Sequence, residues 1–346
     1  MPLSAPAGTS FGFPVFSVKS ETADDNRVDL NQIFKTPHPV IGVVHLLPLP
    51  TTPQWGGSLQ AVFERAEQEA TALAAGGAHG ILVENFFDAP FTKGRVDPAV
   101  VSAMSLVVQR IRHLVPLPVG INLLRNDACS AMAVASCVNA QFIRVNVLTG
   151  VMATDQGLIE GVAHELLRYR RELGSDVKIL ADVLVKHARP LATPNLTVAV
   201  QDTIDRGLAD GIILSGWATG SPPDLEDLEL AKAAAPTTPL FIGSGADWDN
   251  IGDLIQSADG VIVSSSLKRH GQRHQCIDPV RVSQFVESME QGLAKAALRP
   301  AALASSSLSS SSPHGGKGAS GSDPSRNGNG GKDAPRSGER SPVVSR

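Results

Sequence analysis

The sequence has few cysteines and none of the spacings that hold a structural metal. Only three cysteines (Cys129, Cys137 and Cys276) occur among 346 residues, and none form a Cys-x-x-Cys pair. Cys129 and Cys137 lie about two helical turns apart, so the packing of small residues in one helix explains them. There is no His-Glu-x-x-His motif either, and we predict no bound metal of the zinc type. Scattered cysteines of this kind are typical of a reducing compartment.

An excess of positive charge and a long apolar run are also lacking. Lys+Arg number 30 against 34 Asp+Glu, for a net charge of −4, so we predict no nucleic-acid partner. No stretch of about 18 apolar residues is present, and we expect no segment to span a bilayer. The N-terminal residues lack the basic segment of a signal peptide, and none is expected. Membrane association would then be peripheral or through a partner.

What the sequence does contain is a regular alternation of short apolar runs and amphipathic segments. We expect strands at 40–45, 80–84, 118–122, 141–146, 177–183, 211–215, 239–243 and 260–264. We expect helices at 59–75, 97–114, 127–138, 157–173, 196–208, 224–235, 249–257 and 278–298. Eight strand–helix units over about 260 residues predict a single α/β domain, a (β/α)₈ TIM barrel, with a doubly wound sheet as the alternative.

The two ends of the chain differ from this pattern. Residues 1–35 are weakly patterned and are interpreted as an N-terminal extension, and residues 36–298 form the barrel. Residues 299–346 are dominated by Ser and Gly, with a near-continuous serine run at 305–312. Such a composition cannot bury a core, so we predict a disordered tail. Its slight positive balance is compatible with contact to an anionic surface, but a solvated tail is the simpler interpretation.

The segment 179–190 is central to the functional interpretation. It begins as a buried strand that is interrupted by one carboxylate, Asp182, and it continues into Lys186 and His187. Desolvating an unpaired carboxylate costs several kcal/mol, so Asp182 needs a partner or a function. A strand that runs into ionisable groups is typical of the carboxyl end of a strand in a parallel α/β enzyme.

Polar side chains follow nearly every predicted strand, whereas the opposite strand ends carry mainly turn residues. The candidates are His45, Glu84, Asn122, Arg144, Asn146, Asp182, Lys186, His187, Ser215, Gly243 to Gly245, and Ser264 to Ser266. The carboxyl ends of barrel strands meet at one face, which carries the active site in TIM-barrel enzymes. This asymmetry predicts a ligand site at that face.

Two of these loops predict a phosphate site. Gly243, Ser244 and Gly245 follow the seventh strand, and Ser264, Ser265 and Ser266 follow the eighth. Barrels that bind phosphorylated ligands use these two loops, because glycine lets the backbone approach and its N–H groups point at the anion. Ordinary strand–helix turns, which also favour Gly and Ser, are the alternative.

The ionisable candidates suggest acid–base chemistry. Asp182 is the first candidate for general acid or base, with Lys186 near it, but Asp182 could equally tie down a loop or pair with Arg144. Glu84 could share a proton with Asp182 or help to hold a divalent cation such as Mg²⁺. For His45 three roles are open: it acts as a base, it binds a metal, or it is a buried histidine held by hydrogen bonds. His187 transfers protons only if its loop folds inward.

Several runs resemble the BtpA/SgcQ family, and most of all its branch from oxygenic phototrophs. They are IGVVHLLPLP at 41–50, VENFFDAP at 83–90, FIRVN at 142–146, ILADVLVKHA at 179–188, LSGWATGSPP at 214–223 and GSG at 243–245. The resemblance covers about residues 33–270. It therefore omits the N-terminal extension and the tail.

This resemblance implies a ribulose-phosphate-binding-like barrel and a photosystem I biogenesis or stabilisation factor. It implies a peripheral location on the cytoplasmic side of the thylakoid membrane, with photosystem I or its assembly factors as partners. It supplies no reaction. The second hypothesis is an enzyme that acts on a small phosphorylated metabolite by acid–base chemistry at the strand ends, and the two hypotheses are compatible.

Overall fold

The computed structural model describes residues 29–192, 195–216 and 220–298. The predicted disordered tail lies outside the described residues, as do residues 1–28 of the predicted N-terminal extension.

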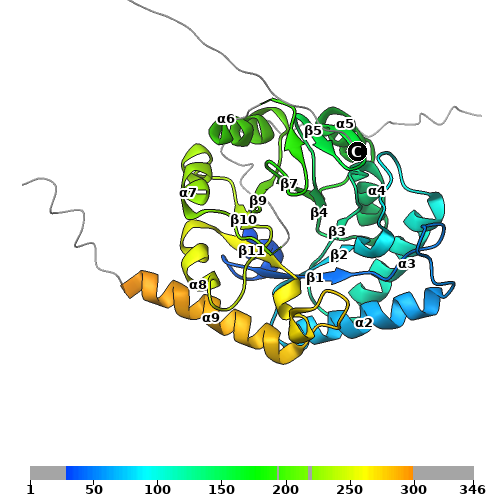
Figure 1. Ribbon diagram of the computed structural model, residues 1–346, viewed down its shortest axis with the longest axis horizontal. Coiled ribbons are helices and arrows are strands. Elements are labelled where there is room, and N and C mark those ends of the chain that lie inside the picture. Colours follow the sequence, from blue (N-terminus) through cyan, green and yellow to red (C-terminus); the bar gives the residue numbers. More distant parts are fainter. Residues whose placement is uncertain (1–28, 193–194, 217–219, 299–346) are drawn as a thin grey trace, which may run out of the picture. The chain divides into compact units, whose positions relative to one another are not determined.

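Eight parallel strands close into a barrel (Figure 1). They are β1 Val40–His45, β2 Gly80–Glu84, β3 Val119–Asn122, β4 Phe142–Val145, β7 Lys178–Asp182, β9 Gly211–Leu214, β10 Leu240–Ile242 and β11 Gly260–Val263. The barrel closes where β1 pairs in parallel with β11, with Val40 opposite Val261. All eight strands coincide with predicted ones, so the predicted (β/α)₈ barrel is confirmed and the doubly wound sheet is excluded.

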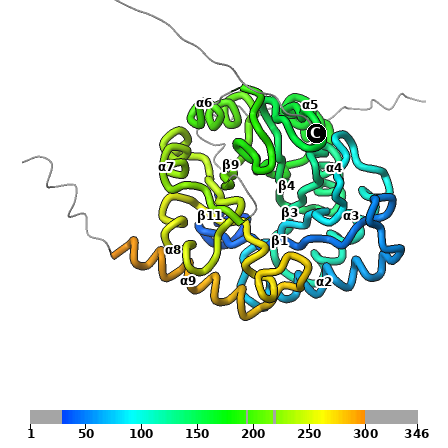
Figure 2. The backbone as a smooth tube through the Cα atoms, viewed as in Figure 1, coloured from blue at the N-terminus to red at the C-terminus, as the bar shows by residue number. Residues whose placement is uncertain are grey.

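Helices surround the barrel, and the chain passes from strand to helix in sequence order (Figure 2). They are α2 Leu59–Ala75, α3 Pro98–Leu114, α4 Ala128–Val138, α5 Ala163–Glu172, α6 Leu196–Gln201, α7 Leu225–Ala234, α8 Ile251–Leu254 and α9 Pro279–Leu298. Helix α6 continues into a π-helical turn at Asp202–Arg206. Side chains cap two of these helices: the Ser58 side chain accepts a hydrogen bond from the Ala61 N–H, and the Asp97 side chain accepts one from the Ala99 N–H. Within the described residues, no helix is long and apolar enough to cross a membrane.

A short helix, α1 Leu30–Phe34, precedes the first strand and packs into the amino-terminal end of the barrel. Phe34 is buried, and its ring meets that of Phe142 edge to face at 5.6 Å. Space for it comes from Gly80, where an added Cβ would lie 2.8 Å from the Phe34 ring. The barrel interior is therefore closed at this end by apolar side chains, and the opposite end is left for a ligand.

The predicted helix at 157–173 begins too early. Residues 151–160 instead form a hairpin, β5 Val151–Thr154 and β6 Gly157–Glu160, and α5 starts only at Ala163. A third short strand, β8 Arg189–Pro190, pairs with β5. Met152 and Ile159 of the hairpin pack with Val185 in a small core of their own. This sheet therefore fixes the loop that follows β7, which carries Lys186 and His187.

Candidate functional site

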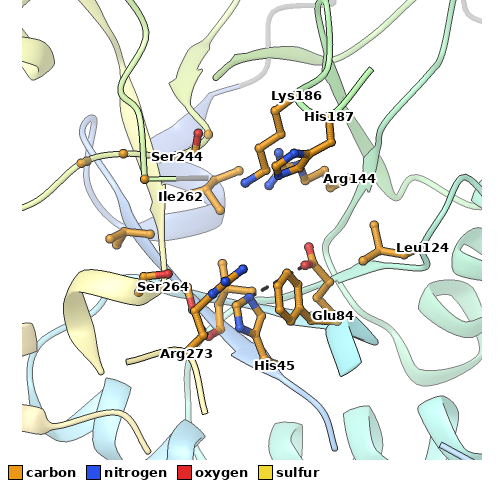
Figure 3. Close-up of a pocket in the computed structure, with 18 of the residues that line it drawn as sticks. His45, Glu84, Leu124, Arg144, Lys186, His187, Ser244, Ile262, Ser264 and Arg273 are labelled. Carbon is orange, nitrogen blue, oxygen red and sulfur yellow. Dashed lines mark hydrogen bonds and ion pairs between the residues drawn. The ribbon is translucent and has the colours of Figure 1, made fainter. Parts of the chain in front are cut away.

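A cavity of about 220 Å³ lies at the carboxyl ends of the strands (Figure 3). The predicted residues that line it are His45, Glu84, Arg144, Asn146, Lys186, His187, Gly243, Ser244, Gly245, Ser264, Ser265 and Ser266. Residues from six of the eight barrel strands, or from the loops that follow them, thus converge on one space. The remaining candidates (Asn122, Asp182 and Ser215) do not line it.

Asp182 is held by a complete set of partners. Arg144 donates to both carboxylate oxygens, from Nε at 2.8 Å and from Nη2 at 2.7 Å, and the Asn146 amide donates a third hydrogen bond at 3.0 Å. The Asp182 and Arg144 side chains are 1% and 4% exposed. This bidentate pair favours the structural alternative for Asp182, in which it orients Arg144 and Asn146 beside the cavity.

Asn122 and Ser215 lie buried near this pair. The Asn122 amide donates to the Asn146 Oδ1 at 3.3 Å, while its own Oδ1 has no partner among the described residues. Ser215 Oγ likewise has no partner in that part of the chain. A Cβ on Gly243 would lie 2.5 Å from Ser215 Oγ and 3.3 Å from Arg144 Nη2, so only glycine fits there. These residues support the cavity wall from behind.

His45 and Glu84 form the floor of the cavity. His45 Nε2 lies 3.8 Å from Glu84 Oε1, and the imidazole stacks on the Phe86 ring at 4.2 Å. Burial lowers the pKa of His45 well below its usual value, and nearby cations, Lys268 first among them, add to this effect. Burial raises the pKa of Glu84, although Arg144 and Lys186 oppose the change. His45 is therefore neutral at physiological pH, and its contact with Glu84 is not an ion pair.

The raised pKa of Glu84 leads to a prediction about stability. The folded state binds this proton more tightly than the unfolded state, so the stability that it contributes is present below the ordinary pKa of 4.5. That contribution is lost as pH rises through the raised value. We expect Glu84→Gln, which resembles the protonated acid, to be more stable than the wild type near pH 8, with a smaller difference near pH 4. Urea denaturation across this pH range measures it.

The matched control for this prediction is Glu165→Gln, at a side chain that is 47% exposed and pairs with Arg95 on the surface. It should show no comparable gain, because a surface pair contributes about 0–1 kcal/mol. A Glu84→Gln protein that is less stable than the wild type at alkaline pH would show that the Glu84 charge is well compensated.

Lys186 and His187 extend into the cavity from the loop after β7 (Figure 3). Burial lowers the pKa of the Lys186 amine, Arg144 lowers it further, and the Glu84 carboxylate opposes both. Burial also lowers the pKa of His187, with Lys186 as the next cause. The His187 backbone has a φ of 58°, in the left-handed region. This turn and the hairpin beside it bring both side chains inward, as the sequence interpretation required for His187.

Two arginines that were not predicted also line the cavity, Arg125 and Arg273. Arg125 follows β3 and donates from Nη2 to the Lys186 carbonyl at 2.9 Å, which links two loops of the mouth. The Arg273 guanidinium lies over the Phe86 ring, 5.9 Å from its centroid. Neither residue ends a strand, so reading strand ends does not find them.

A buried ion pair anchors the loop that carries Arg273. Lys268 and Glu69 are both 0% exposed, and the ammonium donates to the two carboxylate oxygens at 2.9 and 3.1 Å. Arg65 donates to Glu69 at 2.8 Å and to the His274 carbonyl at 3.0 Å. Helix α2 thus fixes the loop on both sides of Arg273.

The predicted phosphate loops lie together on one wall. Gly245 has a φ of 76°, and a Cβ there would lie 2.1 Å from the backbone of Ser221 and Pro222. Ser266 Oγ donates to the Ala246 carbonyl at 2.9 Å, which ties the two loops together. A 3₁₀ turn spans Ser265–Leu267, and Ser264 is the residue that precedes it. Backbone N–H groups at such a turn are the donors that an oxyanion binds.

For a metal, the described residues offer little. No group of three or more His, Cys, Asp or Glu side chains within them is placed to hold an ion. The predicted partnership of Glu84 and Asp182 around a divalent cation does not form here, because the Asp182 oxygens accept from Arg144 and Asn146. Mg²⁺ as a cofactor stays a prediction.

The fold and the site define a (β/α)₈ barrel with a cation-lined cavity at its carboxyl end. The model of the BtpA family matches residues 36–291. The chain belongs to the BtpA family. It is 77% identical over 266 residues to the photosystem I biogenesis protein BtpA of Synechocystis. This match covers 77% of this chain and 93% of that relative. A protein of Thermococcus kodakarensis named as uncharacterised is 45% identical, over 72% of this chain and 94% of its own length.

Among solved structures, a protein cage designed by fusing symmetric oligomeric domains superposes with a TM-score of 0.50. The match covers 76% of each chain at 12% identity. A similarity at this level of identity concerns the fold alone.

Proposed function

We propose that the mouth of the barrel binds a small phosphorylated ligand and acts on it by acid–base chemistry. The observation that carries this proposal is the convergence of Arg125, Lys186 and Arg273 with the glycine and serine loops after β10 and β11 on one cavity. A phosphoryl group is recognised by this combination of side-chain cations and backbone N–H groups.

The charge balance of the cavity supports an anionic ligand. Arg144 is neutralised by Asp182, which leaves three cations on the lining against Glu84 and Asp247. The pKa shifts of Lys186 and Glu84 each favour the neutral form, and the described lining keeps a net positive charge whether this pair is ionised or neutral. Charges in a partly enclosed site are screened less than charges on the surface, so this excess attracts anions.

Glu84 and His45 are the groups that would move a proton. Buried near each other, they have pKa values shifted in opposite directions, which favours a protonated carboxyl beside a neutral imidazole. Such a pair supplies one acid and one base without a metal ligand set. Asp182 contributes by orienting Arg144, and its proposed role is positional.

At the level of the cell, we propose that the chain supports photosystem I biogenesis or stabilisation. Support comes from its 77% identity to a relative of that name. The proposed location is peripheral, on the cytoplasmic side of the thylakoid membrane, with photosystem I or its assembly factors as partners. An enzymatic step that photosystem I biogenesis requires would reconcile this role with the chemistry proposed for the cavity.

A thermal-shift screen of the full chain tests the phosphate site. Phosphorylated sugars and nucleotides are added with and without Mg²⁺. A ligand at about a hundred times its dissociation constant should stabilise the protein by roughly 2.7 kcal/mol, which is seen as a higher melting temperature. Ser244→Glu places a negative charge at the cavity wall, and it should abolish the shift.

The matched control is Ser102→Glu, at an exposed position on α3. It adds the same charge away from the cavity and should keep the shift. A stabilising ligand that Ser244→Glu binds as well as the wild type does would place the anion elsewhere.

A further inference from the structure

Lys186 lines the cavity, and its amine has no partner among the described residues. Its ammonium forms neither a hydrogen bond nor an ion pair with any described residue, although the electrostatic influence of Glu84 and Asp182 reaches it. The other lysine near the mouth, Lys268, is fully buried against Glu69. Only Lys186 of these two faces the ligand space (Figure 3).

The backbone around Lys186 is held in place, in contrast to its amine. Its carbonyl accepts from Arg125 at 2.9 Å, and the preceding Val185 is buried in the hairpin core. A lysine whose backbone is fixed and whose amine has no partner among the described residues can meet a ligand atom. Burial and the nearby guanidinium groups lower the pKa of Lys186, against the effect of Glu84 and Asp182, and so favour the neutral amine, which is the nucleophilic form of lysine.

Lys186 enters the cavity from a different strand than the proposed phosphate loops. It follows β7, whereas those loops follow β10 and β11, and β9 lies between β7 and β10 in the barrel. In Figure 3, Ser244 and Ser264 lie on one side of the cavity, His187 and Glu84 lie on the other, and the Lys186 side chain extends into the space between them. A ligand with its phosphate on the loops therefore directs its remaining atoms toward Lys186.

We propose that Lys186 forms an imine with the carbonyl group of a phosphorylated aldehyde or ketone. This inference rests on the proposed phosphate site and adds the substrate class and the nucleophile.

The chemistry uses groups that line the cavity. The neutral Nζ of Lys186 attacks the carbonyl carbon, the C=O π bond breaks, and a proton moves from nitrogen to oxygen to give a carbinolamine. The protonated Glu84 carboxyl then gives its proton to the hydroxyl, which leaves as water while the nitrogen lone pair forms the C=N bond. Adding water reverses every step, so the sequence needs no oxidant or reductant.

Borohydride trapping with glycolaldehyde phosphate tests the proposal on the full chain. Hydride adds to the imine carbon and leaves a stable secondary amine, whose position peptide mass spectrometry identifies. We expect Lys186 to be labelled at least about tenfold faster by glycolaldehyde phosphate than by glycolaldehyde, because phosphate binding raises the local carbonyl concentration. The exposed Lys93 should show no such preference.

Two variants separate the outcomes. Lys186→Arg cannot form an imine, so it should lose the trapped adduct, whereas Lys93→Arg should retain both the adduct and the binding of inorganic phosphate. If the wild type binds inorganic phosphate but Lys186 is labelled no faster than Lys93, the imine is wrong and the phosphate site stands. If inorganic phosphate neither stabilises the protein nor slows labelling of Lys186, the phosphate site fails. The imine proposal, which rests on that site, then fails with it.

Discussion

Replacing Asp182 by alanine is expected to lower the free energy of unfolding by about 3–5 kcal/mol. Arg144 is only 4% exposed and donates two hydrogen bonds to this carboxylate. Alanine leaves that guanidinium buried without its counter-charge. Asn146 loses its acceptor as well. Urea denaturation of the wild type and the variant measures the loss.

An exposed ion pair provides the matched control. Arg95 and Glu165 are 76% and 47% exposed, and Glu165→Ala should cost no more than about 1 kcal/mol. Asp182→Asn is a second comparison, because it keeps one acceptor oxygen while removing the charge. If a folded Asp182→Asn protein binds the ligand but cannot turn it over, Asp182 acts directly on the proton. If Asp182→Ala costs less than about 1 kcal/mol, the pair does not hold the strand ends together.

The barrel could be predicted because its signal is local and repeated. Each strand is a short apolar run next to a turn, as at Gly80 to Glu84, and each coincides with a predicted run. The strand ends then place His45 and Glu84 side by side without any further information, since parallel neighbours share one edge. Arg144 and Asp182 also lie near the carboxyl ends of neighbouring strands, β4 and β7, so their pairing could be named as an alternative from the sequence.

The hairpin could not be predicted from its residues alone. The run at 157–160 is short and precedes a true amphipathic helix, so periodicity extends the helix backwards over it. Its strand character depends on Met152 and Ile159 finding Val185, which lies about 25 residues further along the chain than Ile159. This tertiary contact decides where Lys186 points.

Arg125 and Arg273 show the same limit within the site. Arg273 lies well beyond the end of β11, and its position depends on Glu69 of helix α2, about two hundred residues earlier. A lysine and a glutamate this far apart in sequence carry no visible pairing signal. The sequence therefore predicts the part of the site that strands position, and it misses the part that loops and buried ion pairs position.

The role of the cavity in photosystem I biogenesis can be tested by complementation. We expect the wild-type chain to restore photosystem I in a Synechocystis strain that lacks its 77% identical relative, and Glu84→Gln to leave photosystem I at the level of the deletion. Glutamine cannot donate or accept the proton, and a general acid or base contributes about 10²- to 10⁴-fold to a reaction rate. Photosystem I per cell, measured by spectroscopy, gives the result.

Glu84→Gln is the informative variant because its expected stability removes the usual ambiguity. Since burial raises the pKa of Glu84, losing this charge should not unfold the protein, and immunoblotting should find it at the wild-type amount. The exposed Glu165→Gln should restore photosystem I fully. If Glu84→Gln also restores it, the barrel acts as a scaffold whose surface contacts a partner. If only Glu84→Gln fails, photosystem I depends on proton transfer in the cavity, and the ligand bound there becomes the molecule to identify.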